Sequence, residues 1–174
     1  MALVLIRRTA IFVFIVVMWA LLSAAVAHSA ARDVVPLPGF APGTIVVKTG
    51  ERRLYYVLDG RYALRFPVGV GKAGQRWFGT ARVEGKYVRP AWSAPDSIRR
   101  EHPNLPEVIP GGSPHNPMGA AALTLRGGEY AIHGTNHPQS IGRFVSHGCI
   151  RMYNRDIVKL FRMVQVGTPV IVER

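Results

Sequence analysis

The sequence predicts a mainly β domain with one amphipathic helix, and three observations lead to this fold class. Short segments rich in β-branched and aromatic residues recur between residues 44 and 172. Most of them are joined by turns that contain glycine. A single stretch after residue 153 has helical periodicity instead. The roughly 145 residues that follow the N-terminal segment suit one domain with its own core.

The first predicted strands follow one another closely. Residues 44–48 form a β-branched run, and residues 53–58 and 61–66 flank Asp59-Gly60, which is the strongest two-residue signal for a hairpin. A further short strand is expected at residues 68–70.

Two more hairpins and a closing strand complete the predicted sheet. Residues 80–84 and 86–88 flank Gly85, which predicts a second hairpin. Residues 121–125 and 129–133 flank Gly127-Gly128, which predicts a third. Residues 169–172 are rich in valine and isoleucine and predict the last strand.

Between these hairpins lies a long irregular segment, residues 90–119. It holds seven of the chain's 13 prolines, and one helical turn is expected near residues 97–101. Long loops of this kind in compact domains often form lids or binding walls. We therefore expect this segment to border a functional site.

One helix is predicted after residue 153. Asn154 is expected to act as its N-cap, with Asp156 in the first turn and Gly167 just past the end. The apolar side chains that repeat at helical spacing are Ile157, Leu160, Phe161 and Val164. This stripe is expected to pack against the sheet.

The N-terminal segment, residues 1–31, has the pattern of a secretory signal peptide. Arg7 and Arg8 precede an uncharged, mostly apolar run, and Ala25-Val26-Ala27 offers a small-x-small cleavage site, with Ser29-x-Ala31 as a second. The alternative is an uncleaved anchor, because the run is long enough to cross a bilayer. Either way the rest is exported, as a Pro- and Gly-rich linker (32–43) and a domain (44–174).

The charge of the exported part is strongly positive. Without Arg7 and Arg8 it has 20 basic against 10 acidic residues, an excess of +10, which favours an anionic partner. No zinc-finger spacing or RNA-binding aromatic motif is present, and export argues against nucleic acid. Anionic polymers of the cell envelope or lipid head groups fit better, and the alternative is that the charge only aids solubility.

The single cysteine, Cys149, lies in "VSHGCIRM" and has no partner for an intramolecular disulfide. A histidine within reach would make its thiol a nucleophile, and both His147 and His133 are candidates. Gly148 lets a substrate carbonyl approach closely, and the N–H groups of Gly148 and Cys149 would form an oxyanion hole. The pattern indicates a cysteine acyl-transfer site; the alternative is a small buried hydrophobic residue.

A metal site is not expected. His133 and His137 lie four apart, but Gly134 and Pro138 argue against a shared helix face, and no run of Asp or Glu completes a ligand set. The sequence predicts no cofactor either.

Several segments together resemble one protein family. "IHGTN" at Ile132 to Asn136 and "SIGRFVSHGCIRM" at Ser140 to Met152 are similar to the catalytic signature of L,D-transpeptidases with a YkuD-like domain. "RLYYV", "VGVGKAG", "HNPMG" and "VGTPVIV" also lie where that family has similar segments, so the resemblance covers residues 43–173. It implies a β-sandwich or barrel-like domain.

The resemblance also implies an activity in peptidoglycan biosynthesis, outside the cytoplasm. The acyl donor would be a stem tetrapeptide, which loses D-alanine and leaves a thioester on the cysteine. An amine of another stem peptide would then give a 3→3 cross-link, and a lysine of an envelope protein would give attachment of that protein. Water would instead give L,D-carboxypeptidase activity. The third alternative is that the chain is a non-catalytic module that binds the cell wall.

The resemblance assigns roles residue by residue. Cys149 matches the nucleophile and His133 the general base, while His147 would shape or polarise the site. Ser146 would orient the loop. At Arg151 the motif has a variant where other members have Asn, and we expect its guanidinium fork to pair with a substrate carboxylate or to form a structural ion pair. Polar and backbone contacts in the cleft would come from Gly134, Thr135 and Asn136. Unlike many family members, the chain shows no peptidoglycan-binding module, so targeting would rest on charge and the catalytic cleft alone. Membrane contact through residues 1–31 is a separate expectation.

Overall fold

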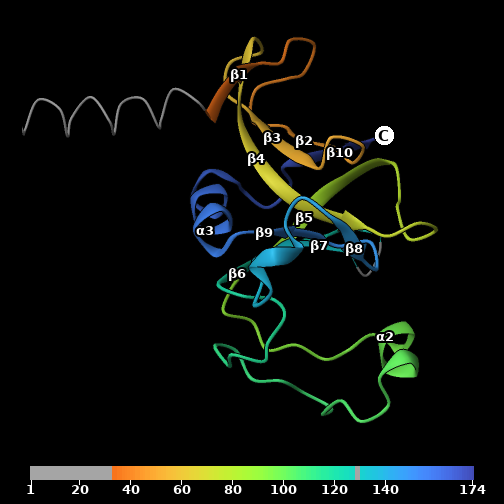
Figure 1. The fold of residues 1–174 in the computed structure, drawn as a ribbon. Coiled ribbons are helices and arrows are strands. Elements are labelled where there is room, and N and C mark those ends of the chain that lie inside the picture. Colours follow the sequence, from red (N-terminus) through yellow and green to blue (C-terminus); the bar gives the residue numbers. More distant parts are fainter. Residues whose placement is uncertain (1–32, 128–129) are drawn as a thin grey trace, which may run out of the picture. The chain divides into compact units, whose positions relative to one another are not determined.

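The computed structural model of the protein describes residues 33–127 and 130–174 (Figure 1). The predicted signal or anchor segment, residues 1–31, lies outside the described residues. The chain divides into two units between Val35 and Pro36, and the second unit contains the predicted domain. Strand β1 (Val34–Pro36) lies at this division. In the described part of the chain, no helix has the length and apolar character needed to cross a membrane.

The second unit is mainly β, as predicted. Its strands are β2 (Ile45–Lys48), β3 (Arg53–Val57), β4 (Tyr62–Gly71), β5 (Gly79–Val88), β6 (Ala121–Leu125), β7 (Ala131–His133), β8 (Phe144–Ser146), β9 (Ile150–Met152) and β10 (Pro169–Glu173). Its two α-helices are α2 (Asp96–Glu101) and α3 (Asn154–Met163), and a 3-10 turn spans Pro138–Ser140. The fold class and the single amphipathic helix after Cys149 are therefore confirmed.

The sheet closes on itself. Hydrogen-bonded neighbours follow the order β4-β3-β2-β10-β5-β6-β7-β9, and β9 pairs back with β4, while β8 pairs with β4 outside this path. Closure leaves few unpaired strand edges and gives a barrel-like body. The last strand, β10, runs parallel to β2 and antiparallel to β5. The C-terminal strand therefore lies between the first predicted strand and a strand from the middle of the chain.

Two of the three predicted hairpins are present. β3 and β4 pair antiparallel, and the Asp59 carboxylate accepts the N–H groups of Arg61 and Tyr62 in the turn. The strand predicted at residues 68–70 is the continuation of β4. β6 and β7 pair antiparallel as predicted around residue 127.

The prediction of a hairpin at Gly85 is wrong. Residues 79–88 form one continuous strand, β5, with a bulge between Val83 and Gly85 where it pairs with β6. A Cβ on Gly85 would lie 2.6 Å from the Tyr87 ring and 2.9 Å from the Thr124 hydroxyl. The glycine therefore serves the close packing of a bulge and not a turn.

The core lies inside the closed sheet and under α3. Helix α3 packs against β6 and β7, with Ile157, Leu160 and Val164 fully buried and Phe161 partly buried. The predicted apolar stripe of the helix is therefore confirmed. The predicted N-cap is wrong, because Tyr153 occupies that position and the helix begins at Asn154, whose amide binds other backbone segments.

The long segment between β5 and β6 is irregular except for α2, which matches the helical turn predicted near residues 97–101. Asn116 fastens its base, because its side-chain amide donates to the carbonyls of Pro90, Ile109 and Pro110 at 2.9–3.1 Å. Figure 1 shows this segment, in green, extending away from the sheet and carrying α2.

Candidate active site

One face of the sheet forms the floor of a cleft of about 430 Å³. The register aligns Tyr87 with Ala122, Ala122 with His133, and His133 with Arg151 across β5, β6, β7 and β9. Cys149 lies two residues before Arg151, and side chains two apart in an extended segment point to the same face. The thiol, the imidazole and the guanidinium thus all line this cleft.

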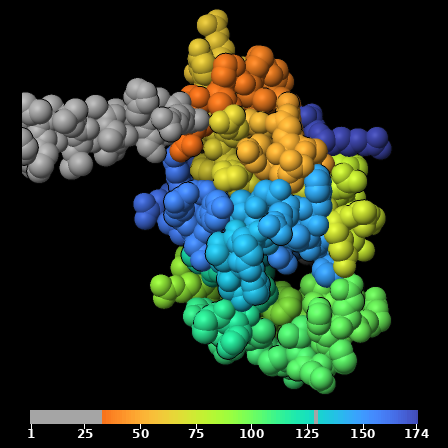
Figure 2. Space-filling view, viewed as in Figure 1, coloured from red at the N-terminus to blue at the C-terminus, as the bar shows by residue number. Residues whose placement is uncertain are grey.

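The segment between β5 and β6 forms the opposite wall of the cleft. The residues that it contributes are Trp92, Ser93, Pro95, Ile98, Pro117 and Met118. Figure 2 shows this green segment as a lobe at the lower side of the unit, beneath the atoms coloured blue. The expectation that the proline-rich segment borders a functional site agrees with this position.

His133 is buried, with 4% of its surface exposed. Its Nδ1 lies 2.6 Å from the Gly134 carbonyl oxygen, which can only accept, so the hydrogen sits on Nδ1 and the neutral ring keeps its lone pair on Nε2. Burial lowers the pKa of His133 to about 4, and the positive charge of Arg151 adds to this effect. The carbonyls of Gly134 and Pro117 oppose it. The ring is therefore neutral at pH 7 and able to accept a proton.

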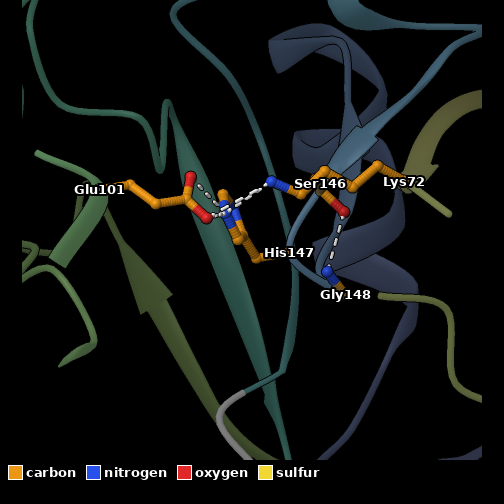
Figure 3. Close-up of polar contacts among 5 residues, drawn as sticks. All are labelled: Lys72, Glu101, Ser146, His147 and Gly148. Carbon is orange, nitrogen blue, oxygen red and sulfur yellow. Dashed lines mark hydrogen bonds and ion pairs between the residues drawn. The ribbon is translucent and has the colours of Figure 1, made fainter. Parts of the chain in front are cut away.

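Cys149 is half-buried and follows a tightly bonded loop. The Ser146 hydroxyl donates to the Cys149 carbonyl at 2.6 Å. It also accepts the Gly148 N–H at 3.1 Å, as drawn in Figure 3. These hydrogen bonds are the orienting contacts expected of Ser146, which is itself buried. Its assignment as a substrate-binding residue stays a prediction.

Gly148 was expected to let a substrate carbonyl approach, but the structure gives another reason for a glycine at this position. Its φ is +119°, and a Cβ there would lie 2.2 Å from the Tyr130 ring. Tyr130 stacks on Trp77, with 5.3 Å between ring centroids, and the Trp77 indole N–H donates to the Gly148 carbonyl at 3.1 Å. An aromatic side chain, and not an approaching substrate, therefore occupies the space beside Gly148.

A hydrogen bond in the same loop affects one of the two N–H groups expected to form the oxyanion hole. The Gly148 N–H is bonded to Ser146, so it does not match its predicted role as an oxyanion donor in this conformation. The role of the Cys149 N–H as an oxyanion donor stays a prediction. Tyr130, which sequence reasoning left without a role, lines the cleft beside the cysteine loop.

His147 connects the cysteine loop to α2. Its Nε2 lies 3.0 Å from both carboxylate oxygens of Glu101 and 3.2 Å from the Lys72 ammonium, as Figure 3 shows. Lys72 and Glu101 form an ion pair at 3.5 Å. The hydrogen bond from His147 is the main cause that lowers the pKa of Glu101. The histidine thus holds the cleft wall to the loop, which agrees with a shaping role.

Sequence reasoning missed Glu101 and Lys72. The contact joins residues 46 and 75 positions from His147 in the sequence. The only local signal was the helical turn expected near Glu101, which does not tell where its side chain points.

Arg151 is a largely buried cation in the cleft. Burial lowers its pKa, and the nearby Cys149 opposes this shift. Among the carboxylates of residues 33–127 and 130–174, none forms an ion pair with it. The alternative of a structural ion pair is therefore not realised in the described part of the chain. The guanidinium faces the space that a ligand would fill.

The roles expected for Gly134, Thr135 and Asn136 in the cleft stay predictions. None of them borders it; Thr135 and Asn136 line a second hollow, with Arg89 and Asn154. The backbone of Thr135 is bonded to the Asn154 side chain, and the Asn136 amide donates to the Pro114 carbonyl at 3.1 Å.

Comparisons with known proteins agree on one family. The family model described as the L,D-transpeptidase catalytic domain, YkuD, matches residues 42–172. The chain is 42% identical over 143 residues to the probable L,D-transpeptidase YbiS of Escherichia coli, covering 77% of this chain and 45% of that protein. It is 35% identical over 143 residues to the putative L,D-transpeptidase YqjB of Bacillus subtilis, covering 79% of this chain and 73% of that protein.

A solved structure shares the fold. It is the catalytic domain of an L,D-transpeptidase from E. faecium acylated by ertapenem, with a TM-score of 0.58 and 23% identity, covering 77% of this chain and 99% of that chain. The chain spans about half the length of curated relatives such as YbiS.

Burial of neutral His133 makes stability depend on pH. The unfolded chain binds a proton at this residue below pH 6.5, and the folded chain binds it only near pH 4, so the free energy of unfolding falls as the pH drops between these values. The full loss from this residue is about 3 kcal/mol. Denaturant unfolding of the parent and of His133→Gln at pH 7.5, 5.5 and 4.5 measures this loss of unfolding free energy. Equal pH dependence in both proteins would show that His133 is not its source.

The contact between Glu101 and His147 should control how often the cleft wall opens. In Glu101→Gln the charge is lost, and trypsin should cleave at Arg99 or Arg100 about two- to fivefold faster, because a solvent-screened ion pair stabilises the closed wall only weakly. Glu107→Gln, in the same segment and also exposed, is the matched control and should be cleaved at the parental rate. Equal rates for both variants would show that the contact does not hold the wall.

Proposed function

The chain belongs to the family of L,D-transpeptidases through its YkuD catalytic domain, and on this premise we propose that it transfers acyl groups from peptidoglycan stem peptides through Cys149. One observation carries the proposal. A half-buried thiol and a neutral, buried imidazole lie on the same face of the sheet, in one cleft. This is the pairing that nucleophilic cysteine catalysis requires.

The first half of the proposed reaction forms a thioester. His133 Nε2 accepts the thiol proton while Sγ attacks the carbonyl between the third residue of the stem and the terminal D-alanine. The Cys149 N–H donates to the oxyanion that develops. The imidazolium then gives its proton to the leaving amine of D-alanine. Because burial and Arg151 disfavour the imidazolium, the proton should move as the S–C bond forms and not before.

The second half resolves the thioester. An amine attacks the thioester carbonyl, His133 takes up its proton, and the thiol is restored. The amine of a second stem peptide would give a 3→3 cross-link, and a lysine of an envelope protein would attach that protein. Water as the acceptor would make the enzyme an L,D-carboxypeptidase, which is the second candidate. The third candidate, a non-catalytic wall-binding module, has no use for the thiol and imidazole in one cleft.

Arg151 is proposed to bind a carboxylate of the donor peptide. Its guanidinium is largely buried, lines the cleft beside Cys149, and has no ion pair with any described carboxylate. A buried cation is costly unless an anion accompanies it, and the guanidinium fork matches a carboxylate in geometry. Binding of the substrate would supply that anion.

The proposed site of action is the bacterial cell envelope. The pattern of residues 1–31 supports export, as a cleaved signal peptide or as an anchor that keeps the domain near the membrane. The excess of +10 on the exported part supports attraction to the anionic envelope. Membrane contact and attachment of an envelope protein both follow from this placement as proposals.

Incubation with a purified tetrapeptide tests the function directly. The parent chain should release D-alanine and form cross-linked dimers, and mass spectrometry would reveal tripeptide instead if water is the acceptor. Cys149→Ala should give neither product, because no thioester forms. With a carbapenem, the parent should gain the adduct mass and the variant should not. An adduct on Cys149→Ala, or no product from the parent, would contradict the proposal.

The role of Arg151 predicts a loss of discrimination between charged and neutral donors. The parent should prefer the free acid of the tetrapeptide over its fully amidated form by about tenfold to a hundredfold, because a hydrogen bond to a charged group contributes about 1.5–3 kcal/mol. Arg151→Gln should lose this preference, and Arg151→Lys should keep part of it. Steady-state kcat/KM values for both donors measure it. A full preference in Arg151→Gln would assign the carboxylate to another residue.

A further inference from the structure

The side chain of Asn154, the first residue of α3, joins two backbone segments to that helix. Its Oδ1 accepts the N–H groups of Ala120 and Thr135, each at 3.0 Å. Its Nδ2 donates to the Thr135 carbonyl at 3.0 Å. One amide therefore clamps Thr135 on both sides of its backbone and ties it to the end of the long segment before β6.

Two glycines leave room for this amide. A Cβ on Gly119 would lie 2.3 Å from the Asn154 Oδ1, and a Cβ on Gly134 would lie 2.2 Å from the same atom. Contacts this short do not occur, so the amide and the glycines require one another. The glycines of "HNPMG" and "IHGTN", fifteen positions apart, are thus explained by one oxygen atom that belongs to neither motif.

The clamped peptide unit also touches the proposed base. The N–H of Thr135 and the C=O of Gly134 belong to the same peptide group, and in a trans peptide they point in opposite directions. The N–H donates to Asn154 Oδ1 at 3.0 Å, while the carbonyl oxygen accepts His133 Nδ1–H at 2.6 Å. A continuous chain of hydrogen bonds therefore runs from Asn154 through one peptide group to the imidazole.

We propose that Asn154 is a positioning residue for the general base and acts on His133 through the peptide group of Gly134 and Thr135. This inference rests on the proposed function. By fixing the peptide plane, Asn154 keeps the Gly134 carbonyl aimed at Nδ1, which holds the ring orientation and places the lone pair on Nε2. Hydrogen bonds in series also polarise one another, so the carbonyl becomes a better partner for the imidazolium that forms during catalysis.

Three variants of the full chain separate positioning from folding. Asn154→Ala removes the clamp, and Asn154→Asp keeps an acceptor oxygen of the same shape. Because Asn154 is exposed, both should fold. Asn104→Ala is the matched control, since Asn104 is an exposed asparagine of the segment between β5 and β6. Circular dichroism and thermal unfolding would verify that each variant retains the fold.

Two readouts are measured on each protein. The first is the second-order rate constant for acylation by a carbapenem, followed by mass spectrometry. The second is the His133 Nδ1–H signal of ¹⁵N-histidine-labelled chain at neutral pH, which His133→Gln identifies by its absence. A merely structural role of Asn154 would not change the exchange of this one ring hydrogen with water.

The expected result is that Asn154→Ala is acylated about tenfold more slowly, which is part of the 10²- to 10⁴-fold that a positioned base contributes. Its Nδ1–H signal should broaden or vanish, Asn154→Asp should recover most of the rate and the signal, and Asn104→Ala should match the parent. A parental rate in Asn154→Ala, a slow rate with an unchanged signal, or no recovery in Asn154→Asp would overturn the inference. A parent that is not acylated would overturn the proposed function instead, and the Nδ1–H signal would still decide the role of Asn154.

Discussion

The parallel pairing of β7 with β9 is the constraint on which the rest of the site depends. It aligns His133 with Arg151 and brings Cys149, 16 residues further along the chain than His133, to the same face of the sheet. Parallel neighbours cannot be joined by a tight turn, so the chain must leave the sheet between them. The intervening 3-10 turn and β8 provide this connection, and β9 then closes the sheet by pairing with β4. The proposed nucleophile and base are therefore held by the closure of the whole sheet.

The electrostatics of the site follow from the same arrangement. Placing a cation beside an imidazole disfavours its protonated form, and burial acts in the same direction. The same cation lies close to the thiol. Arg151 thus disfavours proton gain by His133, while the Gly134 carbonyl supports the imidazolium. The balance between these effects makes the Gly134 peptide group, and whatever fixes it, important to the proposed chemistry.

Two further contacts connect the site to distant parts of the chain. The stack of Trp77 on Tyr130 fixes the cysteine loop from one side, through the hydrogen bond from Trp77 to Gly148. Glu101 fixes the cleft wall from the other side, through His147. The first contact is aromatic and largely insensitive to salt, whereas the second is ionic and partly exposed. The cysteine loop is therefore bonded to a stacked aromatic pair on one side and, through His147, to an ion pair of the cleft wall on the other.

The sequence by itself determined the features that depend on neighbours along the chain. These are the alternation of the strands, the Asp59-Gly60 turn, the apolar stripe of α3, and the Ser-His-Gly-Cys motif with a histidine upstream. The tertiary structure decided which partner each polar group found. It made Gly85 part of a bulge, where Tyr87 and Thr124 lie too close for a side chain, and it bonded the backbone of Thr135 to Asn154. It also placed His147 against the Glu101 carboxylate and bonded the Gly148 N–H to the Ser146 hydroxyl. Local periodicity specifies which face of an element is buried, but hydrogen-bond partners tens of residues apart are fixed only when the sheet closes.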